Sequence, residues 1–491
     1  MDVSMHLNRY GVWGNKIKRV FRRFYRLPFV LKPLEKWVVL GLLAVIIGSL
    51  VLNNWHMGDL RPAYGGTYSE GFVGEPRFIN PILATTDIDQ SLVKLVYSGL
   101  TKLDKNGDVE PDLAKGWESS DGGKSYTVRL RDNVVWHDGQ KFSSKDISYT
   151  VGLIQDQAIK SLYYEAWKDV LVETLDDYTV KFTLKDVSSV FPWRLTVGVL
   201  PQHLGRGSLN SSFVGTGAYK YSKVRMNKDR VEAIILTRNN KWYNATPYIN
   251  EAEFWFYANQ TDVETAFKNQ KIQTISNFGG DMASSEKHCL QLSQQLTLFM
   301  NSQSSVLSDI KIRQKLLSSE ESFSPGITIK LVLDQDSHSN INYEEQEAAW
   351  LKRGVTITEQ LATIDSIKKD ILPKHLYDVI VLPIEYGPQV DPFSYWHSSQ
   401  DSSGFNFSRM KNNDLDKLIV EQRKMIDLTA RAKILAQIDE LIQAQNVVKV
   451  LDENLSCYYV GKSVHVIESK LGTNSADKFD TFNEWYIKTR R

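Results

Sequence analysis

Three stretches of the sequence carry residue types that do chemistry in other proteins, and each misses the spacing that its chemistry needs. Gly122–Ser125 ends like a phosphate-binding loop, but Glu118 stands where that loop requires its first glycine. Asp104–Asp108 alternates side-chain oxygens as a calcium loop does, yet its glycine comes too early. His137-Asp138 is typical of a turn rather than of a catalytic dyad. We therefore predict plain turns and an Asn-Gly hairpin at these places.

The remaining sequence shows no catalytic or metal-binding pattern. The nine histidines form no H-x-x-x-H or H-x-H pair, and there is no G-x-S-x-G nucleophile elbow. Acidic pairs such as Asp176-Asp177 and Glu344-Glu345 lie in polar surroundings, where solvation is the simplest interpretation. The sequence therefore predicts a protein that is not an enzyme and that holds no metal and no cofactor.

Hydrophobic periodicity indicates the elements that would position a binding site. Tyr126–Leu130 alternates apolar and polar residues and predicts a strand, as does Tyr178–Leu184. His137–Gly139 turns the chain, and Ser143 or Ser144 can cap the helix that follows. This part of the chain is therefore a small mixed unit in which no residue is an obvious catalyst.

Further along, strands alternate with helices, which predicts an α/β unit with a mostly parallel sheet. The predicted strands are 327–333, 355–359 and 377–382, and the predicted helices between them are 343–352 and 364–372. A loop rich in aromatic residues, 385–407, follows this unit. The chain then continues with helices 414–426 and 429–445 and with late strands 447–451, 457–460 and 464–467.

Length and charge set limits on the protein. A chain of 491 residues is too long for one core, so we expect two or three compact units. Residues 1–36 hold nine basic and two acidic side chains, a net charge of +7, whereas the whole chain carries +1. The body after residue 36 is therefore mildly acidic, which argues against a nucleic-acid partner.

A membrane span is predicted at residues 37–55, which contain no charged side chain and are flanked by Trp37 and Trp55. A helix of this length reaches about 28 Å, close to the thickness of the hydrocarbon layer. By the positive-inside rule, the basic segment 1–36 stays in the cytoplasm and the body lies outside. No small-x-small cleavage site or cysteine follows the span, so we expect an uncleaved single-pass anchor in the cell membrane.

Cys289 and Cys457 are the only cysteines and lie far apart in the sequence. Outside the membrane they could pair, because disulfides persist in oxidising compartments. Two buried, reduced thiols are the interpretation that we favour, and nothing around them resembles a metal framework.

The order of the segments after the anchor resembles the family 5 extracytoplasmic solute-binding proteins. Two patterns carry this resemblance most specifically: W-x-x-x-x-x-G-x-x-Y-x-x-x-L-R, which begins at Trp117, and V-x-W-H-D-G-x-x-F-S-x-x-D, which begins at Val134. Further similar segments run from Gly65 to about Ile467, including FVGTGAYKY and FNFSRMKNNDLDKLI. Such proteins are the dipeptide- and oligopeptide-binding components of ABC importers.

The resemblance implies an α/β, two-lobed clamshell of the periplasmic-binding-protein type (type II, cluster C) with an extra subdomain, preceded here by one transmembrane helix. Ligand would lie between the lobes, and closure of the hinge would bury it. The expected divisions are cytoplasmic segment 1–36, span 37–55, spacer 56–64, lobe I start 65–99, accessory subdomain 100–214, lobe I 215–297, lobe II 298–459, and lobe I return with the C-terminal tail 460–491.

At three places the sequence departs from the family's pattern, which limits how far the family's properties can be expected of this chain. Pro388 stands where family members commonly place an aspartate that pairs with the amino terminus of a peptide, although Asp391-Pro392 is kept. The link between Arg313 and Ile327 is much shorter than in the family, so the second lobe is trimmed. An anchoring helix also replaces the freely diffusing or lipidated form.

The leading hypothesis is a membrane-anchored protein that binds peptides, or another small solute, for the permease subunits of an ABC importer. The alternative is a surface interaction or sensory module that keeps the fold without transport. The candidate ligand-binding residues come from two loops that the resemblance places opposite each other: Phe78 and Asn80 in the first lobe, and Tyr386, Asp391, Tyr395 and Trp396 in the second. Each also has a structural interpretation, with Phe78 and Trp396 as core residues and Asp391 as the cap of the next turn.

Overall fold

The computed structural model of the chain describes residues 61–209, 213–276, 282, 285–318, 322–335, 341–363, 366–385, 387, 389–401 and 404–490. The basic segment 1–36, the span 37–55, most of the spacer 56–64, Tyr386 and Pro388 lie outside these residues. In the part of the chain that the structure describes, no helix has both the length and the apolar character needed to cross a membrane. Ala63–Lys488 form one compact unit.

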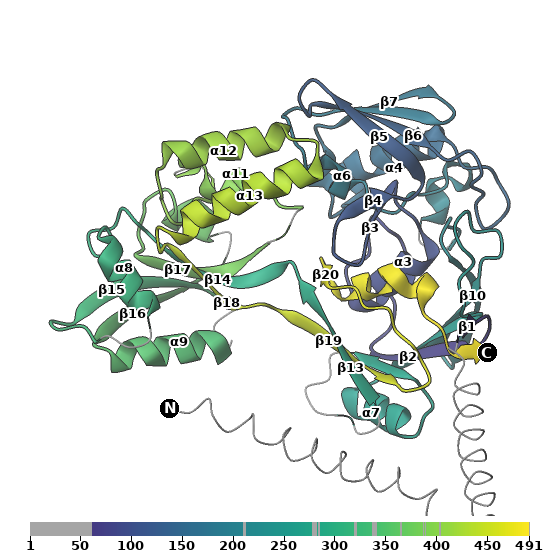
Figure 1. Ribbon diagram of the computed structural model, residues 1–491. Helices are drawn as coiled ribbons and strands as arrows, with labels where there is room; N and C mark the ends of the chain where they lie inside the picture. Colours follow the sequence, from purple (N-terminus) through teal and green to yellow (C-terminus); the bar gives the residue numbers. More distant parts are fainter. Residues whose placement is uncertain are drawn as a thin grey trace, which may run out of the picture. The chain divides into compact units, whose positions relative to one another are not determined.

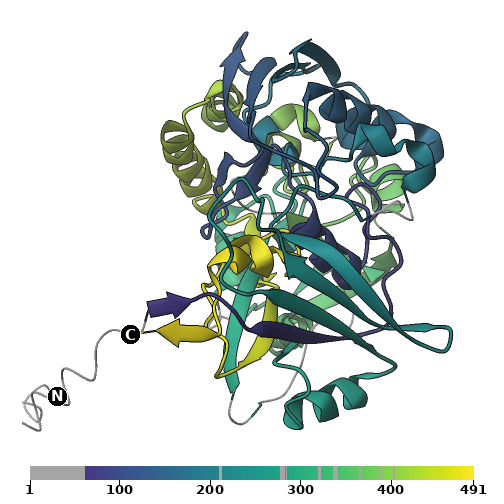
Figure 2. The same cartoon turned by 90° about the vertical axis from the view of Figure 1, so that its right-hand side faces the viewer.

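Lobe I is built on an eight-stranded sheet with the order β20-β13-β19-β12-β2-β11-β10-β9, in which the hairpin β9–β10 forms one edge (Figure 2). Its strands are β2 (Thr67–Val73), β9 (Tyr219–Asn227), β10 (Arg230–Arg238), β11 (Glu251–Tyr257), β12 (Thr274–Ser276), β13 (Ser285–Leu292), β19 (Leu455–Gly461) and β20 (Leu471–Gly472). A separate short ladder pairs β1 (Arg61–Ala63) with β21 (Lys488–Arg490).

Helices cover both faces of this sheet because its strands bury side chains in both directions. In β11, Phe254 and Phe256 pack in the same core as α3 (Asp87–Val96) and the 3-10 helix η7 (Ser475–Glu484). The alternate residue Trp255 packs instead with α7 (Gln260–Lys268). Successive side chains of a strand point to opposite faces, so α3 and α7 lie on opposite sides of the sheet.

The accessory subdomain follows α3 and is an antiparallel sheet with the order β5-β6-β8-β7, covered by a helix. Its elements are β3 (Thr101–Leu103), β4 (Val109–Pro111), β5 (Ala114–Ser120), β6 (Ser125–Leu130), α4 (Ser144–Gln155), α5 (Tyr164–Trp167), β7 (Leu171–Asp176), β8 (Thr179–Thr183) and α6 (Phe191–Arg194). Ser143 caps α4 with a reciprocal capping box, as its position in the sequence predicted.

His137 ties this subdomain to lobe I through both nitrogens of its ring. Its Nδ1 accepts a hydrogen bond from the Gly215 amide at 3.2 Å, and its Nε2 lies 3.1 Å from the Gly217 carbonyl. Burial lowers the pKa of His137 to about 4, so the ring stays neutral. Gly215 cannot carry a side chain, because a Cβ there would lie 1.9 Å from the Val96 carbonyl oxygen.

Lobe II is a five-stranded sheet with the order β16-β15-β17-β14-β18, in which β15, β16 and β17 are parallel. Its elements are β14 (Gln294–Met300), α8 (Ile310–Leu317), β15 (Ile327–Asp334), α9 (Ile341–Lys352), β16 (Val355–Ala362), the π-helical turn η5 (Ile367–Ile371), β17 (Val379–Glu385), α11 (Phe393–Trp396), α12 (Asn413–Lys424), α13 (Leu428–Gln443) and β18 (Val448–Asp452). The predicted α/β alternation is confirmed. The strand predicted at 464–467 is wrong, because only His465 there bridges to another segment, at Tyr486.

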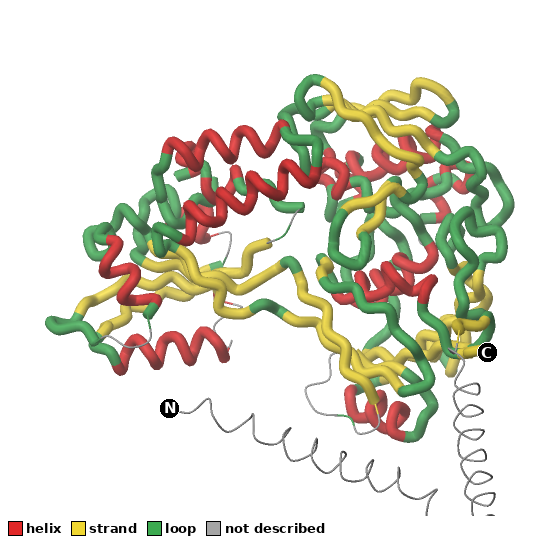
Figure 3. The backbone as a smooth tube through the Cα atoms, viewed as in Figure 1, coloured by secondary structure: helices red, strands yellow, loops and turns green. Residues whose placement is uncertain are grey.

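The two faces of this sheet carry separate cores. Phe299 and Ile380 pack with α12 and α13, which lie side by side in Figure 3, whereas Leu298 and Val381 pack with α8 and α9. Both faces are therefore buried, which explains the nearly continuous apolar run of β17, Val379–Leu382. The two-lobed α/β fold that the sequence predicted is confirmed.

Two adjacent strand pairs carry the chain between the lobes (Figure 1). β13 leads into β14 through Ser293 alone, and β18 leads into β19 through Glu453-Asn454. These crossings lie a few residues before the boundaries expected at 298 and 459.

Cys289 and Cys457 face each other in the β13–β19 ladder and form a disulfide. The prediction of two reduced thiols is therefore wrong. Their separation of 168 residues hid the pairing, since only the tertiary fold places the outgoing and returning strands side by side.

Candidate functional site

The carboxyl ends of the lobe I strands point toward the crossing into lobe II. β13 ends at Leu292 and enters lobe II after Ser293. β12 and β13 both run antiparallel to β19, and β2 and β11 run parallel to β12 and to each other. All four strands therefore end at the same edge of the sheet. In open α/β sheets, ligands bind outside this edge.

A cavity of about 560 Å³ opens at this edge, and we call it the lobe I pocket. It is lined by the end of β2 and the loop after it, by the first turn of α3, and by the end of β11. Its size is that of a small-molecule site. A second cavity in lobe I, beside Lys94 and Asp480, measures only about 80 Å³ and has room for a few water molecules at most.

The loop after β2 is held rigidly at its backbone. The Arg77 amide donates to Asp89 Oδ1 at 2.7 Å, and Asp89 is fully buried in the first turn of α3. Asn80 is 1% exposed: its side chain donates to the Leu209 carbonyl at 2.8 Å and accepts from the Ile82 amide at 3.0 Å. Asn80 therefore shapes the loop through its own chain, whereas Phe78 is 41% exposed and accessible to a ligand.

The pocket contains an ion pair at its rim. Arg230 Nε lies 2.8 Å from Glu75 Oε1, and the Val231 amide donates to Glu75 Oε2 at 3.3 Å. The hydrogen bond from Arg230 and the one from the Val231 amide hold the pKa of Glu75 below its ordinary value. Glu75 is therefore a carboxylate whose charge Arg230 already balances.

In lobe II, the Asp391 carboxylate is bound by its own chain. Oδ1 accepts from the Phe393 amide at 3.1 Å and from Gln422 Nε2 at 2.9 Å, and Oδ2 lies 2.8 Å from Arg423 Nε. Both oxygens are thus engaged, and the bond to the Phe393 amide holds the first turn of α11. Tyr386, the residue expected to lie beside it, is outside the described residues.

The aromatic residues of the second-lobe loop pack largely beneath it. Trp396 is 7% exposed and its ring centroid lies 5.6 Å from that of Phe299. Tyr395 packs against Phe405 and Phe407 at 6.0 and 6.3 Å, and burial raises its pKa. Trp396 also lines a cavity of about 440 Å³ between α13 and β18. The structure therefore brings Asp391, Tyr395 and Trp396 together in one loop, on the opposite lobe from Phe78 and Asn80.

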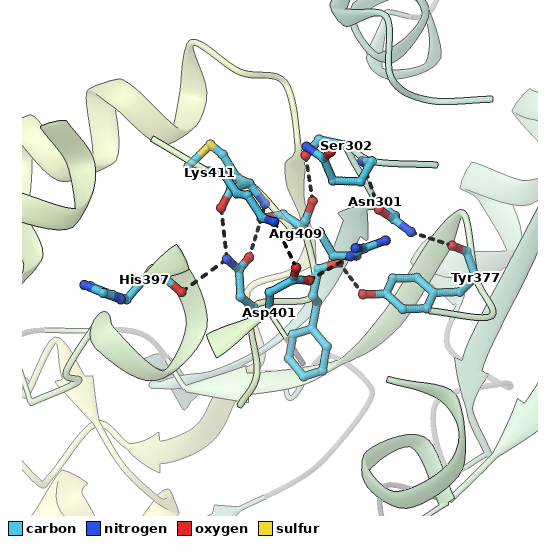
Figure 4. A network of polar contacts seen from close by, with 12 residues as sticks. Asn301, Ser302, Tyr377, His397, Asp401, Arg409 and Lys411 are labelled. Atoms are coloured by element: carbon cyan, nitrogen blue, oxygen red, sulfur yellow. Dashed lines mark hydrogen bonds and ion pairs between the residues drawn. The ribbon is translucent and has the colours of Figure 1, made fainter. Parts of the chain in front are cut away.

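A polar network that the sequence did not reveal anchors this loop (Figure 4). Arg409 Nε lies 2.7 Å from Asp401 Oδ1, and Lys411 lies 3.5 Å from the other oxygen. Burial raises the pKa of Asp401, but the hydrogen bond and charge of Arg409 outweigh it and keep that pKa below its ordinary value. The Tyr377 hydroxyl donates to the Phe407 carbonyl at 2.8 Å.

Main-chain carbonyls complete this network. The Asn406 side chain donates to the carbonyls of His397 and Met410, at 3.3 and 3.1 Å. The Asn301 side chain donates to the Tyr377 carbonyl at 2.9 Å and thereby extends the network to the end of β14. Asn, Ser and Asp are common in loops of any kind, so no sequence signal distinguished these residues.

A second contact joins the lobes away from the hinge strands, and we call it the corner contact. Ser189 of the accessory subdomain donates from its amide to the Arg423 carbonyl at 3.0 Å and from its hydroxyl to the Gln422 carbonyl at 2.9 Å. Leu428 packs against Trp193, and the Arg431 guanidinium lies 5.8 Å from the Trp193 ring centroid. The last carbonyls of α12 are thus capped by the accessory subdomain.

Within the described ranges, no group of three or more His, Cys, Asp or Glu side chains is arranged to hold a metal ion. The lobe I pocket is lined by charged, polar and apolar side chains that are suited to binding a ligand. The arrangement can therefore enclose a ligand between a preformed pocket in lobe I and an anchored loop in lobe II.

Comparisons with known proteins identify the proteins that this chain resembles. A model of the bacterial extracellular solute-binding proteins, family 5, middle region, matches residues 108–316. The oligopeptide-binding protein AppA of Bacillus subtilis (strain 168) is 23% identical over 517 residues, which cover 87% of this chain and 92% of AppA.

Solved structures share the fold. HbpA2 from Haemophilus parasuis superposes with a TM-score of 0.72 at 16% identity, covering 86% of this chain and 100% of HbpA2. Bacillus subtilis AppA in complex with a nonapeptide gives a TM-score of 0.55 at 18% identity, covering 87% of this chain and 100% of AppA. The two lobes described above are therefore shared with proteins of known structure.

Proposed function

Because the chain belongs to the family 5 extracellular solute-binding proteins, we propose that it binds peptides outside the cytoplasm and presents them to the permease of an ABC importer. The observation that carries the proposal is the lobe I pocket, which opens where the strands end and the chain crosses to lobe II. A peptide held there would be covered by the anchored loop of lobe II when the hinge closes.

We propose that residues 37–55 tether the protein to the membrane and leave residues 1–36 in the cytoplasm. The support is the uncharged, tryptophan-flanked stretch and its basic flank. Membrane fractionation combined with N-terminal sequencing tests the tether. The expected product sediments with membranes and begins at Met1, whereas a mature protein that begins near residue 56 would exclude it.

Peptide binding is tested directly with the full chain purified in detergent. A thermal-shift screen against peptide mixtures is expected to raise the unfolding temperature, because a ligand that binds only the folded state stabilises it by mass action. Calorimetry on the active fractions then gives the dissociation constant. If no peptide shifts the transition, the proposal of peptide binding is wrong.

A non-transport role in surface interaction or sensing is the second candidate. Pro388 favours it, because the carboxylate that pairs with a peptide amine in the family is replaced there, and Asp391 nearby is already bound to Arg423. Uptake assays separate the candidates. Deletion of the protein is expected to abolish growth on peptides as the sole source of an essential amino acid, and unchanged growth would favour the non-transport role.

A further inference from the structure

We propose that Arg77 binds a carboxylate of the ligand, so that the lobe I pocket receives the acidic end of a peptide whose neighbouring group is apolar. This inference rests on the proposed function and specifies which part of the ligand lobe I recognises. It adds a charged contact on the lobe opposite Pro388, where the family's amine-binding residue is replaced.

Four charged side chains line the pocket: Glu75, Arg77, Asp87 and Arg230. Glu75 and Arg230 neutralise each other at 2.8 Å. The Arg77 side chain lines the same pocket, is exposed, and makes no ion pair or hydrogen bond within the described part of the chain. An arginine side chain is always charged and presents its N–H groups in a planar fork that matches a carboxylate.

The backbone beneath Arg77 is fixed although its side chain is not. The Arg77 amide is bound by Asp89, and the Asp89 amide in turn donates to Thr86 Oγ1, the cap of α3, at 3.1 Å. The position of the Arg77 Cα is therefore tied to the first turn of the helix that lines the pocket. Only side-chain rotamers remain to be ordered when a ligand binds, which keeps the entropic cost of the contact low.

One part of the pocket wall is apolar, beside the charged side chains of Glu75, Asp87 and Arg230. Val73 lines the pocket and is 44% exposed, and Phe78, one residue after Arg77, is 41% exposed. Phe72 and Tyr257 line the pocket as well. Exposed apolar side chains grouped at a cavity gain by covering a ligand's hydrocarbon. The fitting group is thus a carboxylate next to an apolar side chain, as at the carboxyl terminus of a peptide that ends in a hydrophobic residue.

A single negative charge suits this pocket better than a doubly charged group. One carboxylate would pair with Arg77 and leave the Glu75–Arg230 pair intact. A phosphate dianion would bring a second negative charge close to Glu75 and Asp87, which also line the pocket, and like charges held in proximity repel.

The test uses the full chain and two peptides that share one hydrophobic sequence, one with a free carboxyl terminus and the other with a C-terminal amide. Calorimetry of the unaltered protein is expected to show the free acid binding about tenfold more tightly than the amide, since a charge-assisted contact is lost. Arg77→Gln is expected to weaken the binding of the free-acid peptide by about the same factor and to leave the affinity for the amidated peptide unchanged. Arg77→Lys keeps the charge without the fork and is expected to be intermediate.

Arg129→Gln is the matched control, because Arg129 is an exposed arginine on the accessory sheet that pairs with Glu118 at 2.8 Å. It is expected to leave the preference for the free acid intact. If Arg77→Gln binds peptides and keeps that preference, or if the unaltered protein shows none, the inference is wrong while peptide binding stands. If neither peptide nor any other peptide binds the unaltered protein, the proposed function fails, and the inference falls with it.

Discussion

Two groups of buried charged side chains in lobe I pair with one another. Lys478 lies among Phe72, Tyr458 and Phe479 and reaches Glu70, whose other contacts are the hydroxyls of Tyr68 and Ser276. On the same 3-10 helix, η7, Asp477 and Asp480 both pair with Lys94 of α3, at 2.8 and 2.7 Å. Such groups cost desolvation energy that only complete pairing offsets, so they respond strongly to protonation.

Asp480 is expected to make stability depend on pH. Burial raises its pKa to about 7, with the Lys94 charge acting against this rise and the Asp477 charge adding to it. The pKa of Asp480 in the folded protein lies above its ordinary value, so the protonated carboxyl group favours the folded state. This contribution to the free energy of unfolding is full below about pH 4 and is lost as the pH rises through 7. Asp480→Asn should therefore gain stability relative to the unaltered protein between pH 4 and pH 8, by at most about 4 kcal/mol.

Urea unfolding at several pH values measures this difference. A constant difference between the two proteins across that range would contradict the assignment. Asp132→Asn is a suitable control, because Asp132 is exposed and pairs only with the exposed Lys115.

Asp391 is expected to act on the stability of its loop. Asp391→Asn leaves Arg423 without the carboxylate at 2.8 Å and weakens the hold on α11, so we expect a loss of about 1–3 kcal/mol in urea unfolding. Asp414→Asn, which removes only an exposed pair with Lys417, is the control. A variant that unfolds like the unaltered protein but no longer binds peptide would instead place Asp391 in contact with the ligand.

At the scale of elements, one part of the hinge strands is held by a disulfide and another part is expected to bend. β13 and β19 are linked by Cys289–Cys457 within lobe I, while Ser293 and Glu453-Asn454 carry the chain onward with no further disulfide among the described residues. The disulfide holds the lobe I ends of both crossings in register. Bending during closure is therefore expected in the short connections beyond it.

The disulfide is expected to stabilise the protein without contributing to the pocket. The double variant Cys289→Ser/Cys457→Ser should lose about 2–5 kcal/mol, because the bond closes a long loop that would otherwise enlarge the unfolded ensemble. Thermal unfolding with and without reductant measures the loss, and peptide affinity should be unchanged below the transition. If reductant leaves the unfolding temperature of the unaltered protein where it was, the bond is absent in solution.

At the scale of the whole molecule, the described residues join lobe II to the rest of Ala63–Lys488 at the hinge strands and at the corner contact of Ser189. The accessory subdomain therefore does more than extend lobe I, because it caps α12 of the opposite lobe. A motion that keeps both attachments would turn lobe II about the line between them.

Peptide binding is expected to protect backbone amides at two separated sites. Hydrogen exchange should slow at 73–78 in lobe I and at 389–397 in lobe II, because closure removes both from water. The amides of 457–460, within the disulfide-linked ladder, should exchange at the same rate with and without peptide. Protection confined to lobe I would show that the ligand binds without closure.

The sequence by itself indicated the resemblance to the family 5 solute-binding proteins and the α/β alternation of lobe II, and it predicted a turn at His137. These properties depend on local periodicity and on motif spacing, which are readable along the chain. The strands predicted at 327–333, 355–359 and 377–382 correspond to β15, β16 and β17, because the succession of strands and helices is readable in the sequence of this part of the chain.

Only the tertiary structure decided which residues meet. It paired Cys289 with Cys457, buried Asn80 against Leu209, occupied Asp391 with Arg423, and left Arg77 uncommitted within the described residues while Glu75 was taken by Arg230. Each of these outcomes depends on a partner many residues away or on the other lobe. The physical reason is that the chemical type of a side chain determines which groups it can bind. Which of these groups it meets is determined by the strand order and by the path of the chain between the lobes.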